Sequence, residues 1–171
     1  VGTAQGKSFQ AHSSNMDSYF TPRSKRQIIF DHNHCRCPKI LIVDDDVLCA
    51  NRLESFMDRL EISYETAFNG KQAYDLLTER ENSRCGESCK NFSLVFLDTE
   101  MPIMDGYDTA TQIKEAMNVG DLSRFPLVAC IDYLDEDVTS QICQSGMDDH
   151  CLKPVTFEML KQKLKYYGLI G

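Results

Sequence analysis

Residues 94–106 have the sequence LVFLDTEMPIMDG, in which an apolar run ends in an aspartate. Three other segments have the same form, an apolar run followed by charged or polar residues: KILIVDD at 39–45, FPLVACID at 125–132 and DDHCLKPV at 148–155. Each is typical of a short buried strand. In an open parallel α/β sheet, ligands bind where the strands end. We therefore expect the charged residues at these ends to converge, although they are scattered along the chain: Asp44, Asp45, Asp98 and Lys153.

The rest of the chain after Pro38 alternates between strand-like and helix-like periods. Strands are predicted at Lys39–Val43, Ile62–Ala67, Ser93–Leu97, Leu127–Ile131 and around Cys151. Helices are predicted between and after them, within residues 49–60, 70–77, 110–117, 136–144 and 157–167. A polar stretch, Glu79–Asn91, is predicted to delay the third strand. This alternation predicts an α/β fold, a parallel sheet with helices on both faces.

Length and charge limit the possible functions. The 171 residues suffice for one domain, predicted at 38–171, with a flexible or weakly docked extension at 1–37 that is rich in Ser, Gln, His and Asn. The formal charge of −8 disfavours binding to nucleic acid or to an anionic membrane. No apolar stretch approaches the roughly 20 residues of a membrane span, and no secretion signal is evident. We expect a cytoplasmic domain, and the initial Val1 favours a fragment of a longer parent that is free to carry a membrane anchor.

The converging acids need a counter-charge. Two unit charges about 4 Å apart interact by roughly 4 kcal/mol at an effective dielectric near 20. A hard divalent cation, Mg²⁺ or Mn²⁺, relieves this repulsion through oxygen ligands. Asp98 is then a candidate nucleophile that forms an aspartyl-phosphate, and Lys153 supplies an ammonium to the phosphoryl group. Simpler interpretations exist for each segment alone: residues 44–46 as a helix cap, residues 98–106 as a strand exit and turn, and Lys153-Pro154 as a loop. Their joint occurrence at strand ends favours the phosphoryl site.

These segments resemble the signatures of the receiver domain of two-component response regulators and hybrid histidine kinases. VDDD, LVFLDTEMPIMDG and GMDDHCLKPV carry the resemblance, which spans about residues 38–167. It implies a flavodoxin-like, doubly wound sheet of five parallel strands in the order 2-1-3-4-5, with five helices. It also implies that Asp98 takes a phosphoryl group from a phosphohistidine of a histidine kinase or histidine phosphotransfer domain. Mg²⁺ would be bound by Asp45 directly, by Asp44 through water and by the backbone carbonyl of Glu100, and Lys153 would contact the phosphoryl oxygens.

Two positions depart from the family pattern. Where the family has Ser or Thr at the end of the fourth strand, this chain has Ile131, and a slip of one residue would place Asp132 there. The aromatic switch position in the fifth strand holds His150, which can titrate near neutral pH or be only structural. Two functions therefore remain open. One is a working phosphoacceptor, an enzyme at most in catalysing its own phosphorylation and dephosphorylation. The other is a receiver-like interaction module whose phosphorylation switch is impaired or absent.

Four of the eight cysteines lie near the opposite edge of the predicted sheet. Cys35 and Cys37 precede the first strand, and Cys85 and Cys89 precede the third, which is its expected neighbour. Four thiolates suit Zn²⁺, with His32 and His34 as substitutes, although C-x-C and C-x₃-C are less typical than C-x₂-C. Surface thiols without a ligand and a disulfide are the alternatives, and the family resemblance does not supply a zinc site.

Overall fold

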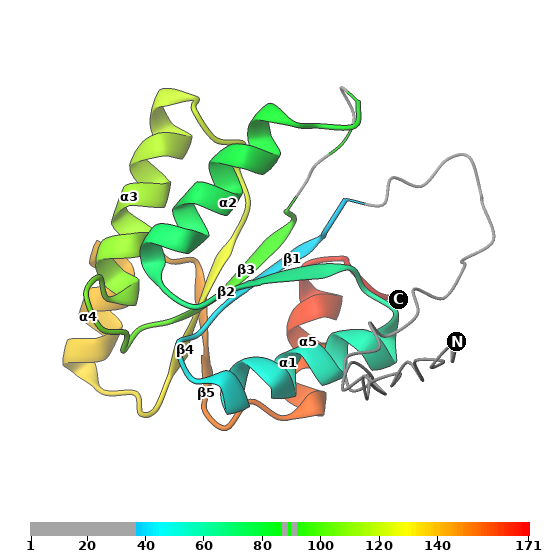
Figure 1. The fold of residues 1–171 in the computed structure, drawn as a ribbon. Coiled ribbons are helices and arrows are strands. Elements are labelled where there is room, and N and C mark those ends of the chain that lie inside the picture. The colour runs from blue at the N-terminus through cyan, green and yellow to red at the C-terminus, as the bar shows by residue number, and fades with distance from the viewer. Residues whose placement is uncertain (1–36, 87–88, 90–91) are drawn as a thin grey trace, which may run out of the picture. The chain divides into compact units, whose positions relative to one another are not determined.

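The structure, a computed structural model, describes residues 37–86, 89 and 92–171. The predicted extension lies outside these residues apart from Cys37, so it stays a prediction. Five strands alternate with five helices (Figure 1): β1 Ile40–Val43, α1 Val47–Leu60, β2 Tyr64–Ala67, α2 Gly70–Asn82, β3 Leu94–Asp98, α3 Gly106–Val119, β4 Leu127–Ile131, α4 Glu136–Gln144, β5 Asp149–Leu152 and α5 Phe157–Tyr166.

The strands form one parallel sheet in the order β2-β1-β3-β4-β5. This confirms the predicted α/β class and the strand order that the resemblance implied. The register pairs Val43 with Leu97 and Asp98 with Cys130, so β1, β3 and β4 end almost level with one another. Side chains that follow these strands are therefore delivered to one edge of the sheet.

Alternate residues of each central strand enter two separate hydrophobic cores. In β3, Val95 and Leu97 pack with residues of α2, α3 and α4, whereas Leu94 and Phe96 pack with residues of α1 and α5. Figure 1 shows the same division, with α1 and α5 on one face of the sheet and α2, α3 and α4 on the other. Since both faces are covered, the central strands β1, β3 and β4 are buried apolar runs, as the sequence predicted, whereas the edge strands β2 and β5 are only partly buried. Within the described ranges, no helix combines the length and apolar character needed to cross a membrane.

Each helix begins at a polar residue whose side chain accepts a hydrogen bond from the first turn, which compensates for the missing helical partners there. These N-cap residues are Asp46, Asn69, Asp105, Asp135 and Thr156. The simple capping interpretation of residues 44–46 therefore holds for Asp46 alone, which accepts from the Leu48 N–H at 2.8 Å. Asp44 and Asp45 remain available for other contacts.

Several predicted boundaries were wrong by a few residues. The second strand begins at Tyr64 rather than Ile62, because the Ile62 N–H closes the end of α1 by donating to the Met57 carbonyl at 3.0 Å. The third strand extends one residue further, to Asp98. The polar stretch that was predicted to begin at Glu79 instead continues α2 to Asn82, where Arg80 pairs with Glu65 of β2. The predictions for β4 and α4 are confirmed to the residue.

Candidate functional site

Charged side chains from three strand ends meet at the carboxyl edge of the sheet. Asp44 follows β1, Asp98 is the last residue of β3, and Lys153 follows β5. The Lys153 Nζ atom lies 2.9 Å from Asp98 Oδ1 and 3.2 Å from Asp44 Oδ2. Residues more than 50 positions apart in the chain are thus in direct contact, as parallel strands with level ends require.

Three carboxylates form one cluster here. Oxygen atoms of Asp44, Asp45 and Asp98 lie within 4.8 Å of one another. Asp44 and Asp98 are buried, with 2% and 3% of their surface exposed, whereas Asp45 is exposed. A set of oxygen donors that is closed on one side and open to water on the other fits Mg²⁺, which keeps several water ligands.

The backbone after β3 is shaped by a close approach that only glycine permits. A Cβ atom on Gly106 would lie 2.1 Å from the Asp98 carbonyl oxygen, and the Gly106 N–H donates to the Thr99 carbonyl at 3.0 Å. The Glu100 N–H donates to Asp98 Oδ1 at 3.2 Å, which orients the carboxylate. These contacts hold the segment that carries Glu100 against the acids. The use of its carbonyl as a metal ligand stays a prediction.

Burial dominates the titration of the acids. It raises the pKa of Asp98 to about 6, although the hydrogen bond with Lys153 and the charge of Lys153 act in the opposite direction. Burial likewise raises the pKa of Asp44, against the Asp46 N–H and Lys153. Burial alone would lower the pKa of Lys153, but the hydrogen bond to Asp98 and the charges of Asp44 and Asp98 outweigh it and raise that pKa. The ammonium is therefore firmly protonated, while the acids carry more negative charge than one lysine balances.

The exit of β5 is tied to the end of β4. The Lys153 N–H donates to the Ile131 carbonyl at 2.8 Å, and the Lys153–Pro154 peptide bond is cis. Ile131 is the last residue of β4 and only 2% exposed, whereas Asp132 lies beyond the strand and is exposed. The residue at the end of β4, next to the acid cluster, is thus an apolar side chain in the core. His150 lies half-buried in β5.

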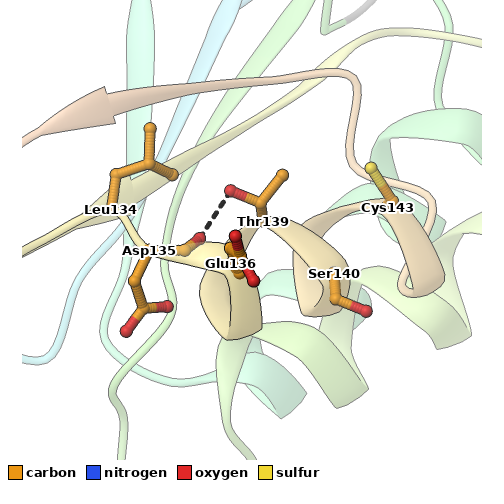
Figure 2. A pocket seen from close by; sticks show the side chains of 6 residues that line it. All are labelled: Leu134, Asp135, Glu136, Thr139, Ser140 and Cys143. Atoms are coloured by element: carbon orange, nitrogen blue, oxygen red, sulfur yellow. Dashed lines mark hydrogen bonds between the residues drawn. The ribbon is translucent and has the colours of Figure 1, made fainter.

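One cavity adjoins this edge, and a second hollow lies along α4. A cavity of about 70 Å³ adjoins the acids and is lined partly by residues that the sequence analysis did not assign to the site, among them Cys49, Arg52 and Cys130. These residues belong to α1 and β4, and no local sequence motif marks them as site residues. A shallow hollow runs along α4, where Thr139 Oγ1 donates to the Asp135 carbonyl at 2.6 Å (Figure 2). It is lined by Leu134, Asp135, Glu136, Thr139, Ser140 and Cys143.

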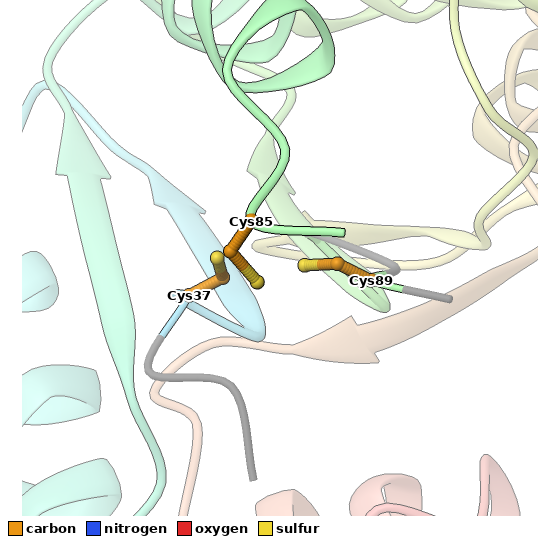
Figure 3. Close-up of side chains that lie close together, drawn as sticks. All are labelled: Cys37, Cys85 and Cys89. Carbon is orange, nitrogen blue, oxygen red and sulfur yellow. The ribbon is translucent and has the colours of Figure 1, made fainter. Parts of the chain in front are cut away.

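Three of the predicted zinc ligands lie at the amino edge. Cys37, Cys85 and Cys89 are brought together, and Cys35 lies outside the described residues, as do His32 and His34 (Figure 3). The two sets of predicted site residues therefore occupy opposite ends of the same strands.

Comparisons with known proteins agree with this architecture. A sequence model of the response regulator receiver domain matches residues 40–165. The hybrid signal transduction histidine kinase A of Dictyostelium discoideum is 30% identical over 130 residues, which make up 76% of this chain and 6% of that protein. The response regulator SSK1 of Arthrobotrys oligospora is 30% identical over 156 residues, covering 75% of this chain and 14% of that protein. The chain thus spans a small part of the curated relatives that it matches.

Two solved structures are similar along most of the domain. A co-crystal structure of the Saccharomyces cerevisiae histidine phosphotransfer signalling protein Ypd1 and the receiver domain of its downstream response regulator Ssk1 matches with a TM-score of 0.67 and 25% identity, over 78% of this chain and 90% of that chain. The receiver domain of the histidine kinase CKI1 from Arabidopsis thaliana, complexed with Mg²⁺, matches with a TM-score of 0.67 and 26% identity, over 75% and 90% of the two chains.

Proposed function

The chain belongs to the response regulator receiver-domain family, and on this basis we propose that it accepts a phosphoryl group on Asp98 during two-component phosphorelay signalling. The contact that carries the proposal is the 2.9 Å ion pair between Asp98 and Lys153, buried beside Asp44. A carboxylate that is oriented by the Glu100 N–H and paired with an ammonium is held ready for in-line attack on phosphorus.

The proposed reaction uses residues that are already in contact. An Oδ atom of Asp98 attacks the phosphorus of a phosphohistidine, the P–N bond breaks, and its electron pair stays on the imidazole nitrogen. Lys153 neutralises charge on the phosphoryl oxygens. A divalent cation held by Asp44, Asp45, Asp98 and the Glu100 carbonyl would supply further charge neutralisation. It would also favour the ionised form of Asp98, whose pKa is about 6 beside Lys153 when no cation is bound.

We further propose that the donor is a histidine kinase or a histidine phosphotransfer domain. The yeast co-crystal structure, in which a similar receiver domain is paired with a histidine phosphotransfer protein, supports this class of partner. The exposed carboxylate of Asp45 and the open side of the acid cluster are compatible with approach of a phosphohistidine from solvent.

A second candidate function is an interaction module that keeps the pocket but switches weakly. The observation that favours it is Ile131, whose side chain is buried in the core and has no hydroxyl to contact a phosphoryl group. Phosphorylation shifts a conformational equilibrium only as far as the two states differ in their contacts with the phosphoryl group. The acceptor chemistry and the switch are thus separable properties of this domain.

Intact-mass analysis after incubation with acetyl phosphate and Mg²⁺ tests the acceptor. We expect wild type to gain one phosphoryl group and Asp98→Asn to gain none. Asp105→Asn is the matched control, because Asp105 caps α3 and Asn keeps that cap. Undiminished labelling of Asp98→Asn would refute the assignment, and an unlabelled wild type would leave only the interaction module.

A further inference from the structure

Three cysteine side chains from separate segments point toward one another at the amino edge of the sheet (Figure 3). Cys37 precedes β1, Cys85 follows α2, and Cys89 lies shortly before β3. Their sulfur atoms all lie within 4.8 Å of one another. Two cysteines often lie close together in a cysteine-rich chain. Here three sulfur atoms converge, one from the segment before β1 and two from the loop between α2 and β3, and together they can bind a metal ion.

We propose that Cys37, Cys85 and Cys89 bind a structural Zn²⁺ ion. Zn–S bonds of about 2.3 Å in a tetrahedral site place the sulfurs about 3.8 Å apart, so the observed cluster needs only a small contraction.

The backbone fixes the described ligands from both segments. Ser63 Oγ donates to the Cys37 carbonyl at 3.0 Å, and the Ser93 N–H donates to the Lys39 carbonyl at 2.7 Å, which joins the residue before β1 to the residue before β3. On the other side, the Cys89 N–H donates to the Gly86 carbonyl at 3.0 Å, closing a turn between the two loop cysteines. Hydrogen bonds in the segments next to the strands therefore hold the backbone of Cys37 and Cys89 near the amino edge of the sheet.

The exposure of the three thiols suits a closed site with one entry side. Cys89 is buried, Cys37 is half-buried and Cys85 is exposed. An ion can enter from the side of Cys85 and lose contact with water as the ligands close. A disulfide would use two of the sulfurs and leave the third beside it, whereas a zinc site uses all three.

The site is remote from the acids. Leu94 begins β3 at the cysteine edge and Asp98 ends it at the acidic edge, about 13 Å apart at a rise of about 3.3 Å per residue. The ion would fasten the residues before β1 to the loop between α2 and β3, and it would take no part in phosphoryl transfer. Its presence or absence can therefore be measured independently of phosphorylation.

Zinc and iron content per protein, measured on the full chain purified under reducing conditions without chelator, tests the proposal. We expect about one equivalent of zinc in wild type and in Cys143→Ser, a control at an exposed cysteine of α4. Cys85→Ser should bind zinc at least about tenfold more weakly in competition with a chromophoric chelator. Wild type reloaded with Co²⁺ should show the ligand-field absorption of a tetrahedral thiolate site.

Each variant is checked for native secondary structure by circular dichroism, so that loss of zinc in a folded domain is distinguished from misfolding. Less than about 0.1 equivalent of zinc in wild type would overturn the site. So would iron in place of zinc, a disulfide among these cysteines after reducing purification, or equal zinc affinity in wild type and Cys85→Ser.

Discussion

The two edges of this sheet gather ligands in opposite ways. At the carboxyl edge, the acids and Lys153 lie at strand ends, so the register of β1, β3, β4 and β5 decides their meeting. At the amino edge, the cysteines lie in loops, and hydrogen bonds between these loops hold the cysteines near one another. The first set offers hard oxygens and the second soft sulfurs, which favour different metals. One fold thus presents two chemically distinct ligand sets whose positions have separate structural causes.

If the two edges are independent, a substitution at the carboxyl edge should weaken Mg²⁺ binding and leave zinc binding at the amino edge unchanged. The largest expected effect is of this kind. Asp45→Ala should weaken Mg²⁺ binding about 100-fold, or roughly 2.7 kcal/mol. The reason is that attraction between a carboxylate and a dication amounts to several kcal/mol near a protein surface. Zinc content should not change. Titration with Mg²⁺, followed by amide shifts, measures the first property, and metal analysis measures the second.

Asp46→Asn is the matched control for this substitution. Asp46 is the exposed neighbour that caps α1, and Asn preserves the cap while removing the same charge. Its Mg²⁺ affinity should stay within a few-fold of wild type, since it lies outside the acid cluster. Unchanged affinity in Asp45→Ala would move the metal away from the carboxyl edge. A parallel loss of zinc would show that the two edges are coupled.

The same contrast explains what the sequence could predict. The acids were predictable because apolar runs mark the strands, and parallel strands bring their ends to one edge. Cys37, Cys85 and Cys89 were placed at the amino edge by the same topology. Gly106 stood in the quoted motif, but its role depends on a 2.1 Å approach to the Asp98 carbonyl that no local pattern encodes. The extension of α2 depends on Arg80 reaching Glu65 of β2, which is also a tertiary contact.

A second prediction concerns how much the acidic edge lowers the free energy of unfolding when no cation is bound. The pKa of Asp98 is raised from 3.8 to about 6 by burial, so the folded protein binds more protons than the unfolded chain between these pH values. Its free energy of unfolding should therefore fall as pH rises from about 4 to about 6. The decrease attributable to Asp98 should be of the order of 1–3 kcal/mol. Its neighbours Asp44, Asp45 and Lys153 are present at every pH of the measurement.

Urea unfolding of wild type and Asp98→Asn in Mg²⁺-free buffer at pH 4 to 7 isolates this contribution. Wild type should lose stability relative to the variant as pH rises, and excess Mg²⁺ at pH 7 should reverse the loss. Chelators are omitted because they would also strip zinc, and any effect of thiol protonation cancels between two proteins with identical cysteines. A stability difference that is independent of pH would mean that Asp98 is not titrating in this range.

The smallest expected effect concerns the response of the carboxyl edge to its ligand. Ile131 ends β4 beside the pocket and packs in the core that α4 also enters. Ile131→Thr provides a hydroxyl that can contact a phosphoryl group, so the liganded and free states should differ more in energy. Beryllofluoride with Mg²⁺ should then cause larger amide shift changes in α4 and β5 than in wild type. Ile131→Val is the control, because it shortens the side chain without adding a hydroxyl.

Equal responses of the Thr and Val variants would show that the missing hydroxyl does not limit switching and would remove the main support for an interaction module. The amides of Cys85 and Cys89 provide an internal reference in the same spectra. They lie at the other end of β3, so the comparison of edges predicts that they respond to zinc and stay unchanged on addition of beryllofluoride. A beryllofluoride response at these amides would mean that the central strands transmit changes along their length, and the two ligand sets would then act as one system.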